Sequence, residues 1–197
     1  MVKQAAAILL LLNVAGSGDP EEEAPSFVYK APIVQKIAFR EGVMLAEERH
    51  TYATNLATYA ANQVVSRMAS KDSLENARRI LALAFHLERR NKQAMVVNFQ
   101  LREGVLPEVK KGDYNPRTFA RLLLSRAKLL LKNANDNMSE KLLGRCFVEL
   151  AAHIDPRNED AVFEYENQRI DEGEIDWSLL TNAVSGQSSK DAEPAAQ

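Results

Sequence analysis

The sequence predicts an all-α fold built from stacked helical hairpins, and three observations support this. Apolar residues recur every three and four positions through most of the chain, which is the spacing of one face of a helix. Alternation of apolar and polar residues, which is typical of strands, is scarce. A shift of the chain by 67 residues aligns its first helical segments with its last ones. With 197 residues, 46% of them hydrophobic, the chain is long enough for one domain with its own core.

The two ends of the chain differ in composition from the segment between them. A lysine precedes the apolar run 5–12 and small residues follow it, an order typical of a secretory signal peptide, so residues 1–17 are predicted to be a cleaved leader. A leader that stays attached is the alternative. Residues 18–32, which contain DPEEEAP, are predicted to be a disordered acidic linker, and residues 182–197 a disordered tail. The folded domain is expected over residues 33–181.

Six helices are expected between these ends, and local signals mark the start of two of them. Asp72 is expected to cap the second helix, with Glu75 completing the capping box. Asn115 is expected to cap the fourth, because Pro116 suits the first helical position. The stretch 33–46 fits either a strand or a helix and stays open. The expected helices span residues 49–69, 73–88, 92–103, 116–133, 139–154 and 158–171.

Matches across the 67-residue shift indicate two copies of one unit, at residues 50–103 and 117–171. The match keeps its register through three helices and two turns, which chance similarity between helix-forming residues would not do. Tyr52 falls on Phe119 in this alignment. Identical pairs include Thr51 and Thr118, Ala53 and Ala120, Leu56 and Leu123, Ala60 and Ala127, Arg78 and Arg145, Ala84 and Ala151, His86 and His153, and Asn91 and Asn158.

The second helix of each unit resembles that of tetratricopeptide-repeat (TPR) proteins. The motif is clearest in the second unit, where the small residues Gly144 and Ala151 lie two turns apart and the segment 155–158, DPRN, closes the helix. The first unit has Ala77 and Ala84 in the same places but lacks the Asp-Pro pair. The resemblance implies an α–α superhelix of TPR-like hairpins, here in two stretched units of about 67 residues. The third helix of each unit is expected to shield an open face.

Charge and motif content narrow the functional classes. A net charge of −2 and a pI near 6.0 do not favour nucleic acid as a partner. No apolar stretch approaches the ~20 residues of a transmembrane helix. No catalytic, cofactor-binding or metal-binding motif is found, so the chain is not expected to be an enzyme. His86 and His153 are expected on the polar side of their helices near the C-terminal end, where the helix dipole favours a protonated imidazole.

The best candidate for partner binding is the helix 116–133. Its polar side chains recur at helical spacing and form a basic stripe, which a solvated helix face would also explain. The resemblance implies that first helices line a peptide-binding groove, where a cationic stripe suits an acidic segment or a C-terminal carboxylate. The stripe comprises Arg121, Ser125, Lys128 and Lys132, expected opposite Phe119, Leu122, Leu123 and Leu130.

Trp177 forms an apolar cluster with Ile175, Leu179 and Leu180 that is expected to cap the last helical face, with docking to another chain as the alternative. Together these features predict an exported TPR-like scaffold, periplasmic or extracellular, that binds a protein or peptide and has no catalytic activity of its own. Two alternatives stay open. One is an accessory or regulatory subunit of an envelope enzyme such as a protease, and the other is a structural assembly subunit.

Overall fold

The computed structural model describes residues 28–36, 38–39, 41–109, 115–135 and 137–183. Within these ranges the chain is mostly helical, so the predicted all-α class is confirmed. All six predicted helices are present, with ends shifted by at most three residues. The helices are α1 (Ala46–Ser66), α2 (Lys71–Leu87), α3 (Lys92–Arg102), α4 (Pro116–Asn133), α5 (Met138–Ile154), α6 (Glu159–Glu172) and the short α7 (Ser178–Thr181).

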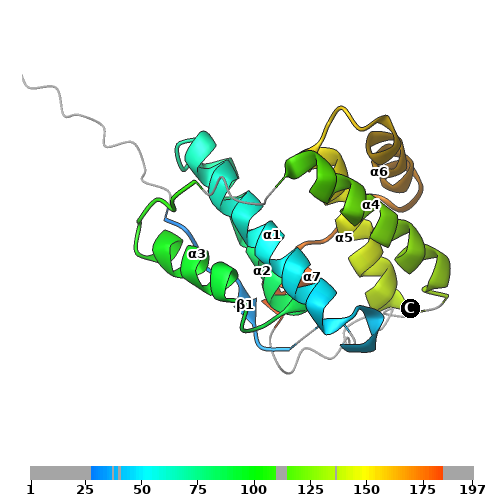
Figure 1. The fold of residues 1–197 in the computed structure, drawn as a ribbon, viewed down its shortest axis with the longest axis horizontal. Helices are drawn as coiled ribbons and strands as arrows, with labels where there is room; N and C mark the ends of the chain where they lie inside the picture. Colours follow the sequence, from blue (N-terminus) through cyan, green and yellow to red (C-terminus); the bar gives the residue numbers. More distant parts are fainter. Residues whose placement is uncertain (1–27, 37, 40, 110–114, 136, 184–197) are drawn as a thin grey trace, which may run out of the picture.

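Two antiparallel helical hairpins lie side by side, α1 with α2 and α4 with α5 (Figure 1). The third helices differ in what they cover, because α3 packs mainly against α1 whereas α6 packs mainly against α5. α3 buries three apolar side chains, but α6 buries only Ala161. The expectation that both third helices shield an open face is therefore met by α3 and only weakly by α6.

The stretch left open at 33–46 contains the two-residue strand β1 (Ile33–Val34) and the 3-10 turn η1 (Glu41–Val43) before α1 begins. β1 pairs in parallel with β2 (Asn182–Ala183), so the two ends of the described chain meet. The fold also extends slightly beyond the predicted domain limits. Tyr29, from the predicted linker, is buried and donates a hydrogen bond to Asn98 of α3, 2.8 Å away. The predicted leader, most of the linker and residues 184–197 lie outside the described residues.

Side-chain oxygens accept hydrogen bonds from the first free amides of most helices. Asn115 caps α4 as predicted, with Pro116 at its first position. Asparagines also cap α3, α5 and α6. The predicted cap of α2 is wrong, because the cap is Ser70, whose hydroxyl accepts from the amide of Ser73. α2 therefore starts two residues earlier than the predicted capping box implies, and Asp72 lies inside its first turn.

Small residues lie where the helices of each hairpin approach one another. Ala77, Ala84, Gly144 and Ala151 are buried as the repeat pattern predicts. At Gly144 the approach is closest, since an added Cβ would lie 2.8 Å from Cγ and 2.9 Å from Cδ2 of Leu131 on α4. Side chains larger than hydrogen are thus excluded at this point of the α4–α5 contact unless Leu131 moves.

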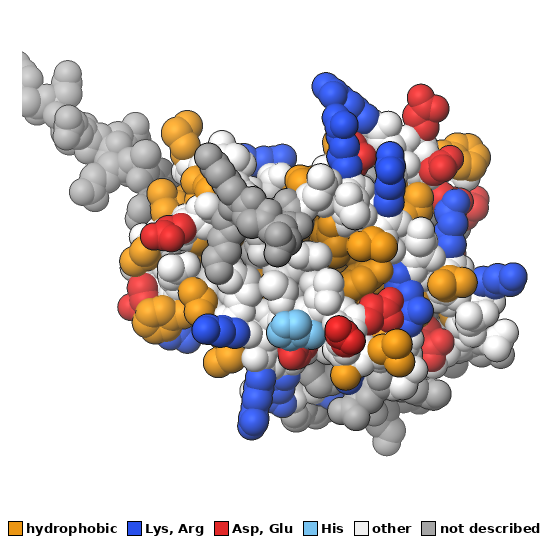
Figure 2. All heavy atoms as spheres, in the orientation of Figure 1, with side chains coloured by type: hydrophobic (Ala, Val, Ile, Leu, Met, Phe, Trp, Pro, Cys, Tyr) orange, Lys and Arg blue, Asp and Glu red, His pale blue; other side chains and the backbone are white. Residues whose placement is uncertain are grey.

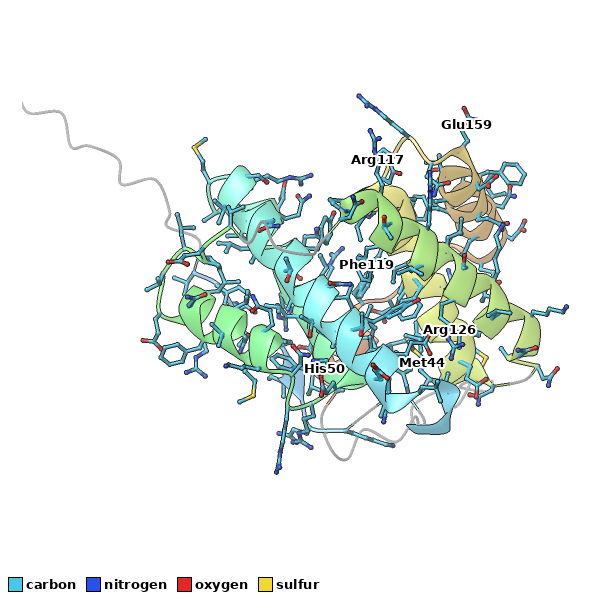
Figure 3. All side chains as sticks on the ribbon, viewed as in Figure 1. Met44, His50, Arg117, Phe119, Arg126 and Glu159 are labelled. Atoms are coloured by element: carbon cyan, nitrogen blue, oxygen red, sulfur yellow. The ribbon has the colours of Figure 1, made fainter. Side chains whose placement is uncertain are left out.

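Aromatic side chains join the two hairpins. The Tyr52 ring of α1 lies 5.7 Å from that of Phe119 and 5.4 Å from that of Phe147, centroid to centroid. Its hydroxyl donates to the Leu122 carbonyl of α4, 3.0 Å away, and burial raises the pKa of Tyr52 to about 12. Figure 3 shows Phe119 between α1 and α4 and Arg126 along the same junction, where Arg126 pairs with Glu48 at 3.3 Å. Helices from both units therefore share one core.

His86 holds the two ends of the described chain against α2. Its Nδ1 accepts a hydrogen bond from the Ala38 amide at 3.1 Å, so the ring proton lies on Nε2, which donates to the Leu180 carbonyl at 2.9 Å. The side chain is 2% exposed, so the expected polar position is wrong for His86, whereas His153 is exposed. Burial lowers the pKa of His86, and the bond to Leu180 opposes that change. The imidazole is held neutral because its protonation would break the bond from Ala38.

The close approach at Gly144 predicts an unusual response to alanine. Gly144→Ala should destabilise the protein by about 1–3 kcal/mol, because overpacking outweighs the helical preference of alanine. In a Leu131→Ala background the added methyl has room, and the same change should be neutral or stabilise by up to about 1 kcal/mol. Denaturant unfolding followed by circular dichroism measures both. Stabilisation by Gly144→Ala in both backgrounds would show that the helices are not in contact there.

The neutral state of His86 predicts a pH-dependent stability. Its folded-state pKa is lowered, so its contribution is fully present above the unfolded pKa of about 6.5 and is lost as pH falls below that value. The free energy of unfolding should fall between about pH 7 and pH 5, by less than about 1.4 kcal/mol per pH unit for this single proton. The His86→Gln variant should be less stable than the parent at neutral pH, and its free energy of unfolding should change less with pH. His153→Gln is the matched control and should keep the parent slope, and an unchanged slope in His86→Gln would contradict this assignment.

Candidate binding surfaces

The structure places the predicted polar residues of α4 on its exposed side. Figure 2 shows Lys and Arg side chains along this side, with hydrophobic side chains toward α1. The opposite side of α4 packs against α5, and Phe119, Leu123 and Leu130 are buried there as expected. The exposed set is Arg121, Ser125, Lys128 and Lys132.

One expected core residue of α4 lies on the exposed side instead. Leu122 was expected to be buried, but its side chain is 45% exposed, and Leu129, seven residues later, is 52% exposed. The sequence pattern missed this because α4 has more leucines than α5 can cover, and spacing alone does not show which of them are left out. The exposed side of α4 is therefore basic and apolar together. We call the six residues Arg121, Leu122, Ser125, Lys128, Leu129 and Lys132 the α4 face.

The charges of the α4 face are only partly neutralised by the rest of the molecule. Lys128 pairs with Glu164 of α6 at 3.0 Å, and both side chains are largely exposed. Exposed ion pairs of this kind contribute little free energy, so a carboxylate from another molecule can replace Glu164 at low cost. Arg121 and Lys132 form no ion pair with any described residue. The α4 face thus retains unpaired positive charge.

The corresponding side of α1 is not open in the same way. Thr58 and Ala61, which fall on Ser125 and Lys128 in the 67-residue alignment, are 5% and 1% exposed. They are covered because α3 packs against α1. A continuous groove lined by both first helices, as the TPR resemblance implies, is therefore not formed on this side. Any contact surface of this type is confined to α4.

Trp177 is a packing residue in this structure. Its side chain is 6% exposed, and its Nε1 donates to Oε1 of Glu149 on α5, 3.0 Å away. Ile175 and Leu180 are buried beside it, whereas Leu179 is exposed. The expected cluster therefore covers the core without Leu179. Since a partner could not reach the indole ring without displacing this segment, Trp177 does not belong to an exposed docking surface.

The segment that carries Trp177 also forms one wall of a polar cavity of about 420 Å³. It passes between α2 and α5 (Figure 1), and those two helices with α6 provide the other walls. Burial raises the pKa of Glu149 in this cavity, while the bond from Trp177 and the charge of His153 lower it. Sequence reasoning missed the cavity because its lining comes from four separate segments. The lining includes Glu75, Arg78, Arg79, Glu149, His153 and Tyr165.

The part of the chain that the structure describes has neither a candidate metal site nor a candidate membrane-spanning helix. It contains no group of three or more His, Cys, Asp or Glu side chains placed to hold a metal ion. None of its helices is both long enough and apolar enough to cross a membrane. Cys146 is fully buried, and burial raises the pKa of its thiol well above the usual value.

No family model, curated protein or solved structure matches this chain.

Proposed function

We propose that this protein is a scaffold of two TPR-like units that binds an acidic segment of another protein on the α4 face. The observation that carries the proposal is the exposure of Leu122 and Leu129 among unpaired cationic side chains on one helix. Apolar residues in water between like charges are typical of a surface that another chain covers. The proposal assigns no catalytic activity to the chain itself.

Three local features support the duplication that the proposal assumes. α5 begins and ends 67 residues after α2. Asn91 and Asn158 cap the third helices in the same way, each accepting from the amide three residues later. The turns between the paired helices also agree, since Met68 and Asn135 both have positive φ angles, of 49° and 43°. A non-glycine residue rarely adopts this conformation, so its recurrence at equivalent positions favours a common origin of the two turns.

The spacing of charge favours an extended acidic segment over a C-terminal carboxylate. Arg121 and Lys132 are 11 residues apart in sequence, which is about 16 Å along a helix. A single carboxylate can contact only one end of this face, whereas a segment of several residues can contact all of it. Leu122 and Leu129, two turns apart on the same side, would receive apolar side chains of that segment. The expected ligand is therefore an amphipathic segment rich in Asp and Glu.

Charge reversal on the α4 face tests this function directly. The triple variant Arg121→Glu, Lys128→Glu and Lys132→Glu should bind a synthetic Glu/Leu amphipathic peptide roughly ten- to a hundredfold more weakly than the parent, because three exposed ion pairs are lost. It should gain affinity for the same peptide with Lys in place of Glu. Fluorescence anisotropy at low and high salt measures both, and the parent affinity should fall with salt.

A matched control changes the net charge equally at another surface. Arg89→Glu, Arg90→Glu and Lys92→Glu alter three exposed cations around the turn between α2 and α3, and this variant should keep the parent preference for the acidic peptide. Leu122→Ser with Leu129→Ser should weaken binding without changing charge. If the parent binds both peptides equally, or if the two triple variants behave alike, the α4 face is not the binding surface.

The proposed scaffold acts outside the cytoplasm if residues 1–17 are a cleaved leader. The support is the order of lysine, apolar run and small residues in the sequence. Expression of the full chain in cells with an envelope, followed by mass spectrometry of the intact protein, should show a new N-terminus near residues 15–18. A mass that includes Met1 would contradict export by this route.

A further inference from the structure

The polar cavity behind Trp177 lies away from the α4 face and uses none of its residues. It is an open cavity lined by residues of α2, α5, α6 and the segment 174–182, so it forms only when both hairpins and the C-terminal segment are in place. Its volume of about 420 Å³ is within the range of small-molecule sites in proteins. Charged and aromatic side chains from different walls face one another there. The cavity therefore has the features expected of a ligand site.

The α2 wall provides a guanidinium with unused hydrogen-bonding capacity. Arg79 approaches only Glu75, at 3.8 Å from its Nε, which is too long for a hydrogen bond, and that Nε atom is buried without a partner. The Nε of its neighbour Arg78 is also buried without a partner, but the Arg78 guanidinium donates to Asn182 at 2.7 Å and lies 3.6 Å from the same Glu75 carboxylate. Arg79 is thus the cation of this cavity that is available to an anionic group.

The α5 wall provides a carboxylate that is only half engaged. Oε1 of Glu149 accepts from Trp177, and Oε2 makes no hydrogen bond with a described residue. Desolvation at this half-buried position raises the pKa of Glu149, so a cationic partner would stabilise its charged form. Asp176 does not compete, since it accepts a hydrogen bond from the Ser178 amide at 2.9 Å. Glu174 is exposed to solvent.

Arg79 and Glu149 line the same cavity, and the positive charge of Arg79 lowers the pKa of Glu149. The two side chains do not form an ion pair with each other. Two opposite charges that are held apart by the fold are bridged best by a molecule carrying both charges at short separation. We propose that the cavity binds a free α-amino acid, with its carboxylate on Arg79 and its ammonium group on Glu149. Bidentate contact with a guanidinium and a charge-assisted bond to a carboxylate are the strongest contacts available to such a ligand.

The remaining walls favour an apolar or aromatic side chain on the ligand. Trp177 and Ile175 are almost fully buried and line the same cavity, together with Tyr165. The ring of Tyr165 is fixed by an edge-on contact with His153, with 5.3 Å between the ring centroids. Of these three side chains only Tyr165 is partly exposed, so its ring is the surface on which a ligand side chain can stack. We therefore expect leucine or phenylalanine to bind more tightly than glycine or aspartate.

Isothermal titration calorimetry of the full chain with L-leucine and L-phenylalanine tests the site. Removing one charge from the ligand should weaken binding roughly ten- to a hundredfold, both for the amino-acid amide, which lacks the carboxylate, and for the N-acetyl derivative, which lacks the ammonium group. Equal binding of the free amino acid and either derivative would overturn the proposal. So would the absence of binding at about 10 mM, since a built site should exceed the affinity of a single weak contact.

Variants assign each charge to its side chain. The Arg79→Gln variant lacks the guanidinium that contacts the ligand carboxylate, so it should bind the amino-acid amide as tightly as the free amino acid. The Glu149→Gln variant lacks the carboxylate that contacts the ammonium group, so it should bind the N-acetyl derivative as tightly as the free amino acid. Arg67→Gln changes an exposed arginine outside the cavity and should keep the parent preferences. If either cavity variant keeps the parent preference for the free amino acid over both derivatives, the side chain replaced in that variant does not contact the ligand. None of these residues lies on the α4 face, so amino-acid binding and peptide binding can each fail without the other.

Discussion

The two hydrogen bonds of the His86 ring hold together segments that are far apart in sequence. Ala38 and Leu180 are separated by most of the described chain, yet both bind the same buried imidazole. A buried polar group without a partner is costly, so neither end can leave α2 without leaving one nitrogen of the buried imidazole unbonded. The Leu180 amide in turn donates to the carbonyl of Trp177, 3.1 Å away, and Trp177 lines the polar cavity. The cavity therefore depends on the neutral state of a histidine that does not line it.

The two units share their local structure but not their surroundings. His86 and His153 are equivalent in the alignment, yet the first is buried under both chain ends and the second is exposed beside Tyr165. The third helices differ similarly, since α3 covers α1 while α6 covers α5. The physical reason is that both terminal segments bond to His86, through Ala38 and Leu180, whereas His153 bonds to neither of them. The two aligned segments thus contain helices at matching positions, while the remaining contacts decide which faces stay open.

The open faces carry different chemistry and suit different ligands. The α4 face is cationic and carries two exposed leucines, which suits a segment of another protein. The cavity carries both signs of charge and has aromatic side chains in its lining, which suits a small zwitterion. Arg121 and Lys132 are exposed, so salt screens them, whereas the half-buried carboxylate of Glu149 is screened less. The two proposed interactions therefore differ in their expected sensitivity to ionic strength.

The sequence by itself determined the helices, the cap of α4 and the positions of the small residues. These depend on contacts within a few residues or on a spacing of one helical turn, so they can be read along the chain. Burial of His86, exposure of Leu122, the covering of Trp177 and the lining of the cavity could not be read in this way. Each depends on which of several apolar or polar side chains meets a distant segment, and spacing alone does not rank those choices. Only the packing of the hairpins and the chain ends decided them.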